Sequence, residues 1–258
     1  MAIAMAPGQT EVVVYEGKVP ENILWFMTAV TNVWQFSSSW GFQVSGSSAT
    51  ALAVMALRGQ SFFNASGDSD SNTPYPYNGG TPCTNLPYGS CCHPQLMSVG
   101  GTTLTTGSPG CYYTSEAVWN YGMINGHPVG SGGGICAYPI PSWQIGAANA
   151  QNHGSTTRRN FPDVALTADN IYIRYGNGQS AIGAGTSAAA PLWAAYIALV
   201  NQQAAAEGAW SVGFINPILY ATGMGKAGAL FRDIATGANS WPCYPSNYPA
   251  VTAAGPTR

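Results

Sequence analysis

The chain has 258 residues, only 7% of them charged, and its formal net charge at pH 7 is −2. The eight Lys and Arg residues are scattered, which argues against nucleic acid and against an anionic membrane surface as partners. No apolar stretch is long enough to cross a bilayer, and the opening MAIAMAPG lacks the basic start of a signal peptide. A polar but nearly uncharged surface changes little when carboxylates protonate, so it suits an acidic environment.

Short apolar runs alternate with helical patterns along the chain. They predict helices at residues 20–32, 47–59 and from about 187 to 203, and strands at residues 10–17, 33–41, 61–69, 97–104, 162–169 and 171–176. Strand–helix–strand alternation predicts an α/β fold, a doubly wound and mostly parallel sheet with helices on both faces. Residues 68–94 and 107–160 are expected to be long irregular loops, and no linker divides the chain, so residues 1–258 are expected to form a single domain.

The segment GAGTSAAAPLWAAYIALVNQQ contains the start of the last predicted helix, and Ser187 in it has two interpretations. As an N-cap, Ser187 would accept hydrogen bonds from the first turn, with Pro191 also placed in that turn. As a nucleophile, it would use the free N–H groups and the dipole of the helix N-terminus. The segment alone favours capping, so the decision depends on residues elsewhere in the chain.

Candidate partners for Ser187 lie at the ends of other predicted strands, where doubly wound sheets concentrate function. Asp68 follows one strand, and Ser39, Trp40 and Gly41 follow another. The glycine-rich segment Ser131, Gly132, Gly133 and Gly134 is able to bring backbone close to a bound chain. Singly, each has an ordinary explanation: a turn aspartate, a core tryptophan and a flexible loop.

Together and in this order, these segments resemble the sedolisin family of serine-carboxyl peptidases, which has a subtilisin-like architecture. The resemblance covers about residues 4–239 and rests on AMAPGQTEVVVYEG, SSSWG, ASGDS, SVGGT, EAVWN, SGGG, PSWQ, FPDVALTAD, GAGTSAAAPLWAAYIALVNQ and FRDIATGAN. The subtilisin group is the rival, but it needs a general-base histidine in an HGT-like setting and an oxyanion asparagine. His93, His127 and His153 lack that setting, and we expect structural or surface roles for them.

The resemblance implies an acid-acting endopeptidase with Ser187 as nucleophile and Asp68 in the oxyanion hole. A carboxyl group donates a hydrogen bond only when it is protonated, so this oxyanion hole would require acidic pH. Ser39–Gly41 and Ser131–Gly134 would flank the substrate. The expected partner is a peptide or protein substrate, bound by a monomer, with no role for nucleic acid or membrane.

The resemblance also implies a general base, a glutamate oriented by an aspartate one helical turn later, on a helix just before AMAPG. None of the five glutamates in this chain is followed by an aspartate four residues on. We therefore expect a family core without that segment, and Asp163 is the first substitute base to test. A non-catalytic peptide-binding homologue and an esterase-like serine hydrolase are the alternatives.

FRDIATGAN resembles the start of the family's calcium loop, with Asp233 as carboxylate ligand and Ile234 as carbonyl ligand. No acidic residue follows Asp233, so the calcium site is expected to be incomplete.

The six cysteines show no zinc-ligand spacing. Five of them fall in the Gly/Pro-rich middle of the chain, which favours disulfides, an oxidising compartment and secretion over free buried thiols. We expect at least one disulfide within Cys83–Cys136, with Cys91 and Cys92 bonded to different partners because vicinal bridges are strained.

Overall fold

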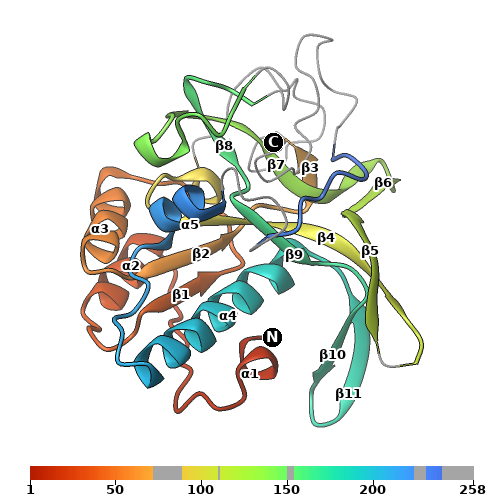
Figure 1. The fold of residues 1–258 in the computed structure, drawn as a ribbon, viewed down its shortest axis with the longest axis horizontal. Helices are drawn as coiled ribbons and strands as arrows, with labels where there is room; N and C mark the ends of the chain where they lie inside the picture. The colour runs from red at the N-terminus through yellow and green to blue at the C-terminus, as the bar shows by residue number, and fades with distance from the viewer. Residues whose placement is uncertain (72–88, 110, 150–153, 224–230, 240–258) are drawn as a thin grey trace.

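A computed structural model describes residues 1–71, 89–109, 111–149, 154–223 and 231–239 (Figure 1). Its main sheet contains the strands β1 (Gln35–Ser38), β2 (Ser61–Ala65), β4 (Met97–Gly107), β5 (Tyr112–Val118) and β9 (Val164–Thr167). β1, β2, β4 and β9 pair in parallel, and β5 pairs antiparallel with the end of β4. The mostly parallel sheet is confirmed.

Helices cover both faces of this sheet. The adjacent side chains of Phe62 and Phe63 point to opposite faces, as alternation along a strand requires. Phe62 lies in a cluster with α2 (Pro20–Thr28) and α3 (Gly46–Leu57), and Phe63 lies in a cluster with α4 (Thr186–Ala206) and α5 (Ile215–Gly223). The doubly wound α/β fold is therefore confirmed. In the described part of the chain, none of the helices combines the length and apolar character needed to span a bilayer.

A second sheet forms where the sequence predicted loop. β7 (His127–Pro139) pairs with β3 (Ser69–Ser71), β6 (Asn120–Ile124) and β8 (Arg158–Phe161). The prediction missed β7 because its glycine run has low strand propensity, and its pairing depends on segments distant in the sequence. Short 3₁₀ turns lie at η1 (Ser90–Cys92) and η2 (Ser142–Gln144).

Two further strand predictions had different outcomes. Residues 171–176 do form a strand, β10 (Ile171–Tyr175), but it pairs antiparallel with β11 (Gln179–Gly183) in a hairpin outside the main sheet. The strand predicted at residues 10–17 is wrong: after a short helix, α1 (Ala2–Met5), the chain continues as coil with Val12, Val13 and Val14 exposed. A β-branched run forms a strand only beside a hydrogen-bonding neighbour, and this run has none among the described residues.

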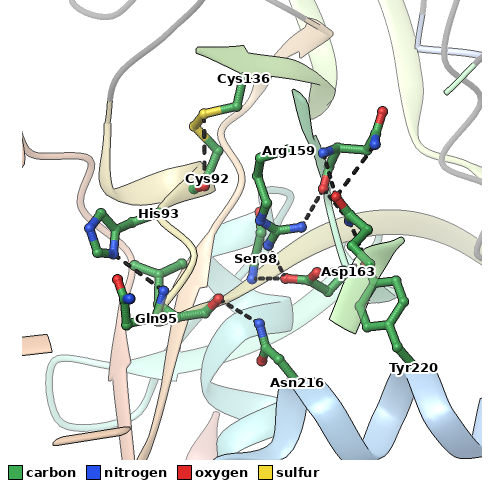
Figure 2. Close-up of polar contacts among 12 residues, drawn as sticks. Cys92, His93, Gln95, Ser98, Cys136, Arg159, Asp163, Asn216 and Tyr220 are labelled. Carbon is green, nitrogen blue, oxygen red and sulfur yellow. Dashed lines mark hydrogen bonds and ion pairs between the residues drawn. A yellow bond between two sulfur atoms is a disulfide. The ribbon is translucent and has the colours of Figure 1, made fainter. Parts of the chain in front are cut away.

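A buried polar network joins β4, β8, β9 and α5 (Figure 2). Asp163 is its centre: Oδ2 accepts from Arg159 Nη2 at 2.6 Å and from the Ser98 N–H at 2.8 Å, and Oδ1 accepts from Tyr220 Oη at 2.8 Å. Both side chains of the Arg159–Asp163 ion pair are fully buried. Asp163 is therefore committed to holding these elements together, which does not fit the suggestion that it acts as a base for Ser187.

The disulfide Cys92–Cys136 joins η1 to β7, as expected for a bridge within residues 83–136. Cys91 keeps a free thiol, so the expectation that it too is bonded is wrong, and burial raises the pKa of that thiol to about 11. Cys111 is free and exposed. Cys83 and Cys243 lie outside the described residues.

Candidate active site

The helix that carries Ser187 begins two residues earlier than it would if Ser187 were its N-cap. α4 starts at Thr186, its N-cap is Gly185, and the N-cap residue makes no side-chain hydrogen bond. Ser187 is in the first turn and exposed. Its side chain therefore does not cap the helix, and the capping interpretation is wrong.

Asp68 provides the missing cap from a distant part of the chain. Its Oδ1 accepts from the Thr186 N–H at 2.8 Å and from Thr186 Oγ1 at 2.7 Å, across 118 positions of sequence. The same threonine hydroxyl lies 3.2 Å from both the N and the O of Gly67. Thr186 thus fixes the Asp68 loop to the start of α4, a role that the sequence analysis missed. Within the described residues, no hydrogen bond engages Ser187 Oγ.

The second carboxyl oxygen of Asp68 lies against Gly185. Gly185 has φ 146°, which L side chains rarely adopt, and a Cβ placed on it would lie 3.0 Å from Asp68 Oδ2. Glycine is therefore required at this position on two grounds. Because Oδ1 already accepts two hydrogen bonds, Oδ2 is the oxygen available to carry a proton.

Pro191 affects the backbone of Ser187. Pro191 was expected in the first turn of the helix, but it lies beyond that turn, inside α4. Proline has no N–H to donate to the carbonyl four residues earlier. That carbonyl belongs to Ser187, and it accepts a hydrogen bond from Ser39 Oγ at 2.9 Å. Ser39, from the end of β1, thus replaces the missing helical bond and anchors the residue that carries the candidate nucleophile.

The other residues predicted to flank a substrate differ in exposure. Trp40 is 80% exposed beside Ser39, and Gly41 is partly buried. In contrast, Ser131–Gly134 lies buried inside β7. The Gly132 N–H donates to the Gly67 carbonyl at 2.7 Å, and Ser66 Oγ donates to the Gly132 carbonyl at 2.8 Å. In this structure the glycine-rich segment therefore supports the loop that precedes Asp68.

Close backbone packing explains why this segment needs glycine. A Cβ at Gly132 would lie 2.2 Å from the Ser66 carbonyl oxygen, and one at Gly133 would lie 2.9 Å from Asn239 Nδ2. Ser131 Oγ accepts from the Gly101 N–H at 2.9 Å, and the Ser131 carbonyl accepts from Asn239 Nδ2 at 2.9 Å. Any larger side chain would push β7 away from the Asp68 loop.

Neither of the two described histidines, His93 and His127, hydrogen-bonds to Ser187. His93 is buried, and its Nδ1 accepts from the Gln95 N–H at 3.3 Å (Figure 2). Burial, followed by the charge of Arg159, lowers the pKa of His93 to about 4. His127 is exposed at the start of β7, and His153 lies outside the described residues.

The two predicted calcium ligands, Asp233 and Ile234, lie in the described segment 231–239. Asp233 is exposed, and the Ile234 side chain packs against Val118. No group of three or more His, Cys, Asp or Glu side chains in the described part of the chain is placed to hold a metal ion. A calcium site needs six to eight oxygen ligands, several of them usually carboxylates.

A mostly parallel α/β sheet, with an exposed serine in the first turn of a long helix beside an aspartate at a strand end, defines a subtilisin-like fold. Pseudomonas sedolisin, a serine-carboxyl proteinase solved with pseudo-iodotyrostatin, superposes with a TM-score of 0.70 at 25% identity, over 86% of this chain and 60% of that one. The chain belongs to the sedolisin family of serine-carboxyl peptidases.

Curated relatives agree with this assignment. Kumamolisin from Bacillus sp. strain MN-32 is 31% identical over 93% of this chain and 43% of its own length. Sedolisin from Pseudomonas sp. strain 101 is 34% identical over 76% of this chain and 32% of its own length. This chain thus spans less than half the length of either relative. No family model matches the chain.

Proposed function

We propose that this chain is an acid-acting endopeptidase that cleaves peptide bonds through Ser187, with Asp68 in the oxyanion hole. The observation that carries the proposal is the cap of α4: because Asp68 binds Thr186, the Ser187 hydroxyl is left free at a helix N-terminus. The peptidase relatives and the family assignment support the reaction class.

The chemistry would begin with attack of Ser187 Oγ on the carbonyl carbon of the scissile bond. The carbonyl oxygen becomes an oxyanion, which the Ser187 N–H, the helix dipole and a proton on Asp68 Oδ2 would stabilise. Collapse of the tetrahedral intermediate breaks the C–N bond, releases the amine and leaves an acyl group on Ser187. Water then hydrolyses this ester and restores the serine.

Acidic pH follows from the proposed donor. A carboxylate only accepts hydrogen bonds, so Asp68 would stabilise an oxyanion only in its protonated form. The low charge of the chain favours the same condition, because few surface groups change charge on acidification.

The proton of Ser187 Oγ must pass to a base as the bond to carbon forms. Among the described residues, none accepts a hydrogen bond from Ser187 Oγ. We therefore expect slow hydrolysis when the 258-residue chain is assayed alone. In serine proteases, the oxyanion hole and substrate binding retain roughly 10³–10⁴-fold acceleration over water after a triad member is lost.

An extended peptide substrate would lie beside Ser39–Gly41. Trp40 offers a large exposed apolar surface to a substrate side chain, next to the residue that anchors Ser187. We further propose that the chain acts as a monomer and that it works outside the cytoplasm. The Cys92–Cys136 disulfide supports the second of these proposals, because disulfides persist in oxidising compartments.

Because no described residue accepts a hydrogen bond from Ser187 Oγ, a second function is also supported, that of a peptide-binding homologue without catalysis. Digestion of casein at acidic pH separates the two. Release of peptides by the wild-type chain, absent from Ser187→Ala and reduced in Asp68→Ala, supports the peptidase. Binding of peptides without cleavage, equal in wild type and Ser187→Ala, would replace it with the second function.

A further inference from the structure

The carbonyl of Ser187 lies at a gap in the hydrogen bonding of α4. In an α-helix each carbonyl accepts from the N–H four residues later, and for Ser187 that residue is Pro191. Proline has no N–H, and its ring crowds the carbonyl four residues before it. The helix therefore fixes the peptide group that follows Ser187 less firmly than a helix turn without proline would.

A side chain from a distant part of the chain fills this gap. Ser39 Oγ donates to the Ser187 carbonyl at 2.9 Å, across 148 positions of sequence. Ser39 directly follows β1, which pairs in parallel with β2, and α4 packs against both strands (Figure 1). On the other side of the same peptide group, the Ala188 N–H donates to the Gly185 carbonyl at 3.0 Å. The peptide group after Ser187 is thus held at its oxygen by Ser39 and at its nitrogen by the helix start.

The ends of two neighbouring strands hold the start of α4 together. Asp68, after β2, accepts from the N–H and the hydroxyl of Thr186. Ser39, after β1, donates to the carbonyl of the next residue, Ser187. The residue that carries the candidate nucleophile therefore lies between two anchors, one on each side of its Cα. Its position depends on both of them.

The bond from Ser39 should matter for position more than for stability. Ser39 and Ser187 are both exposed, so water is able to replace the hydrogen bond at either partner when it is lost. Reaction geometry is less tolerant, because a misplacement of about 1 Å can lower a rate by about 10²-fold. Loss of this bond should therefore slow the reaction of Ser187 and leave the Tm nearly unchanged.

We propose that Ser39 is a positioning residue for Ser187, and that Pro191 makes the reaction depend on it. The inference rests on the proposed function for its catalytic meaning, but the anchoring of the Ser187 carbonyl stands without catalysis. It gives the segment Ser39–Gly41 a second role besides flanking a substrate. A peptide bound beside Trp40 and the nucleophile would then share one loop, the one at the end of β1.

A double-mutant cycle of Ser39→Ala and Pro191→Ala tests the proposal. The rate of Ser187 acylation by p-nitrophenyl acetate at acidic pH should fall about 10-fold in Ser39→Ala, with the half-saturating ester concentration unchanged. Pro191→Ala supplies an N–H for the Ser187 carbonyl, so in that background Ser39→Ala should change the rate by less than about twofold. Ser39→Thr keeps the hydroxyl and should retain most of the rate. Ser115→Ala, at an exposed serine of β5, is the matched control and should react as wild type.

Hydrogen exchange over residues 184–192 reports the anchor without catalysis. Exchange should be faster in Ser39→Ala than in wild type, and Pro191→Ala should remove this difference. Unchanged acylation in Ser39→Ala, an equal loss with and without Pro191, or a Tm that falls together with the rate would overturn the inference. Faster exchange in Ser39→Ala, in a chain whose Ser187 is never acylated, would keep the anchor and refute the proposed function.

Discussion

Replacing Asp163 with asparagine should destabilise the protein severely. Asparagine fills a similar volume, but it removes the negative charge that pairs with Arg159 inside the protein. The amide has one accepting oxygen and a donating Nδ2, so it cannot accept at both positions where the carboxylate accepts from Ser98, Arg159 and Tyr220. Breaking a fully buried ion pair on one side costs about 3–5 kcal/mol, because the other charge stays buried without compensation. For a chain of this size that is a fall in Tm of roughly 10 °C.

Thermal and urea unfolding at pH 7 measure this effect. Glu11→Gln is the control, because it removes a carboxylate from exposed coil and should shift the free energy of unfolding by less than about 0.5 kcal/mol. Arg159→Met combined with Asp163→Asn should cost less than the sum of the single variants, since the second change removes the orphaned charge. A loss below about 1 kcal/mol in Asp163→Asn, or strict additivity, would refute the reasoning. Lost hydrolysis at unchanged Tm would make Asp163 a base after all.

Three further predictions concern acid stability, the disulfide and the general base. Burial lowers the pKa of His93 from 6.5 to about 4, so between these pH values the folded state binds fewer protons than the unfolded state. The stability that neutral His93 confers therefore falls as the pH drops through this window. The shift corresponds to about 3 kcal/mol, and the difference in unfolding free energy between wild type and His93→Gln should shrink by that order from pH 7 to pH 4; a constant difference would contradict it. Replacing both Cys92 and Cys136, 44 positions apart, with alanine should cost about 2–4 kcal/mol in denaturant unfolding, whereas Cys111→Ala at an exposed free thiol should cost little. Fusing a relative's helix with its glutamate and aspartate ahead of Met1 should raise acid-pH peptide cleavage by orders of magnitude, and an equal gain in Ser187→Ala would show that the added segment acts elsewhere.

The strand–helix alternation was sufficient to predict four of the five strands of the main sheet and three of its helices, but it missed β5, which lies in a stretch predicted to be loop, and α5. Short apolar runs identified β1, β2, β4 and β9, and helical patterns identified α2, α3 and α4. The strand prediction failed for residues 10–17 because an apolar run does not show whether a neighbouring strand is available to pair with it. The prediction failed for β7 because strand propensity treats a glycine run as loop. In β7 the glycines instead allow close backbone contact with Ser66.

The candidate site was predicted in part. The order of the motifs was enough to choose Ser187 and Asp68, but not to find the bond from Thr186 to Asp68 or the bond from Ser39 to the Ser187 carbonyl. Pro191 was a usable signal for the second bond, because a proline within a helix leaves the carbonyl four residues earlier without its partner.

Formation of an acyl-enzyme tests the central claim, that Ser187 is a nucleophile supported by Asp68, most directly. An activated ester such as p-nitrophenyl acetate lowers the demand for a general base, so acylation should be detectable in the chain alone. After incubation at acidic pH, peptide mapping by mass spectrometry should find the acetyl group on Ser187. Ser187→Ala should carry none in that peptide, and Asp68→Ala should acylate at least about 10²-fold more slowly, the usual cost of losing an oxyanion donor. Acetylation spread over lysines with Ser187 unmodified, or an unchanged rate in Asp68→Ala, would contradict the account.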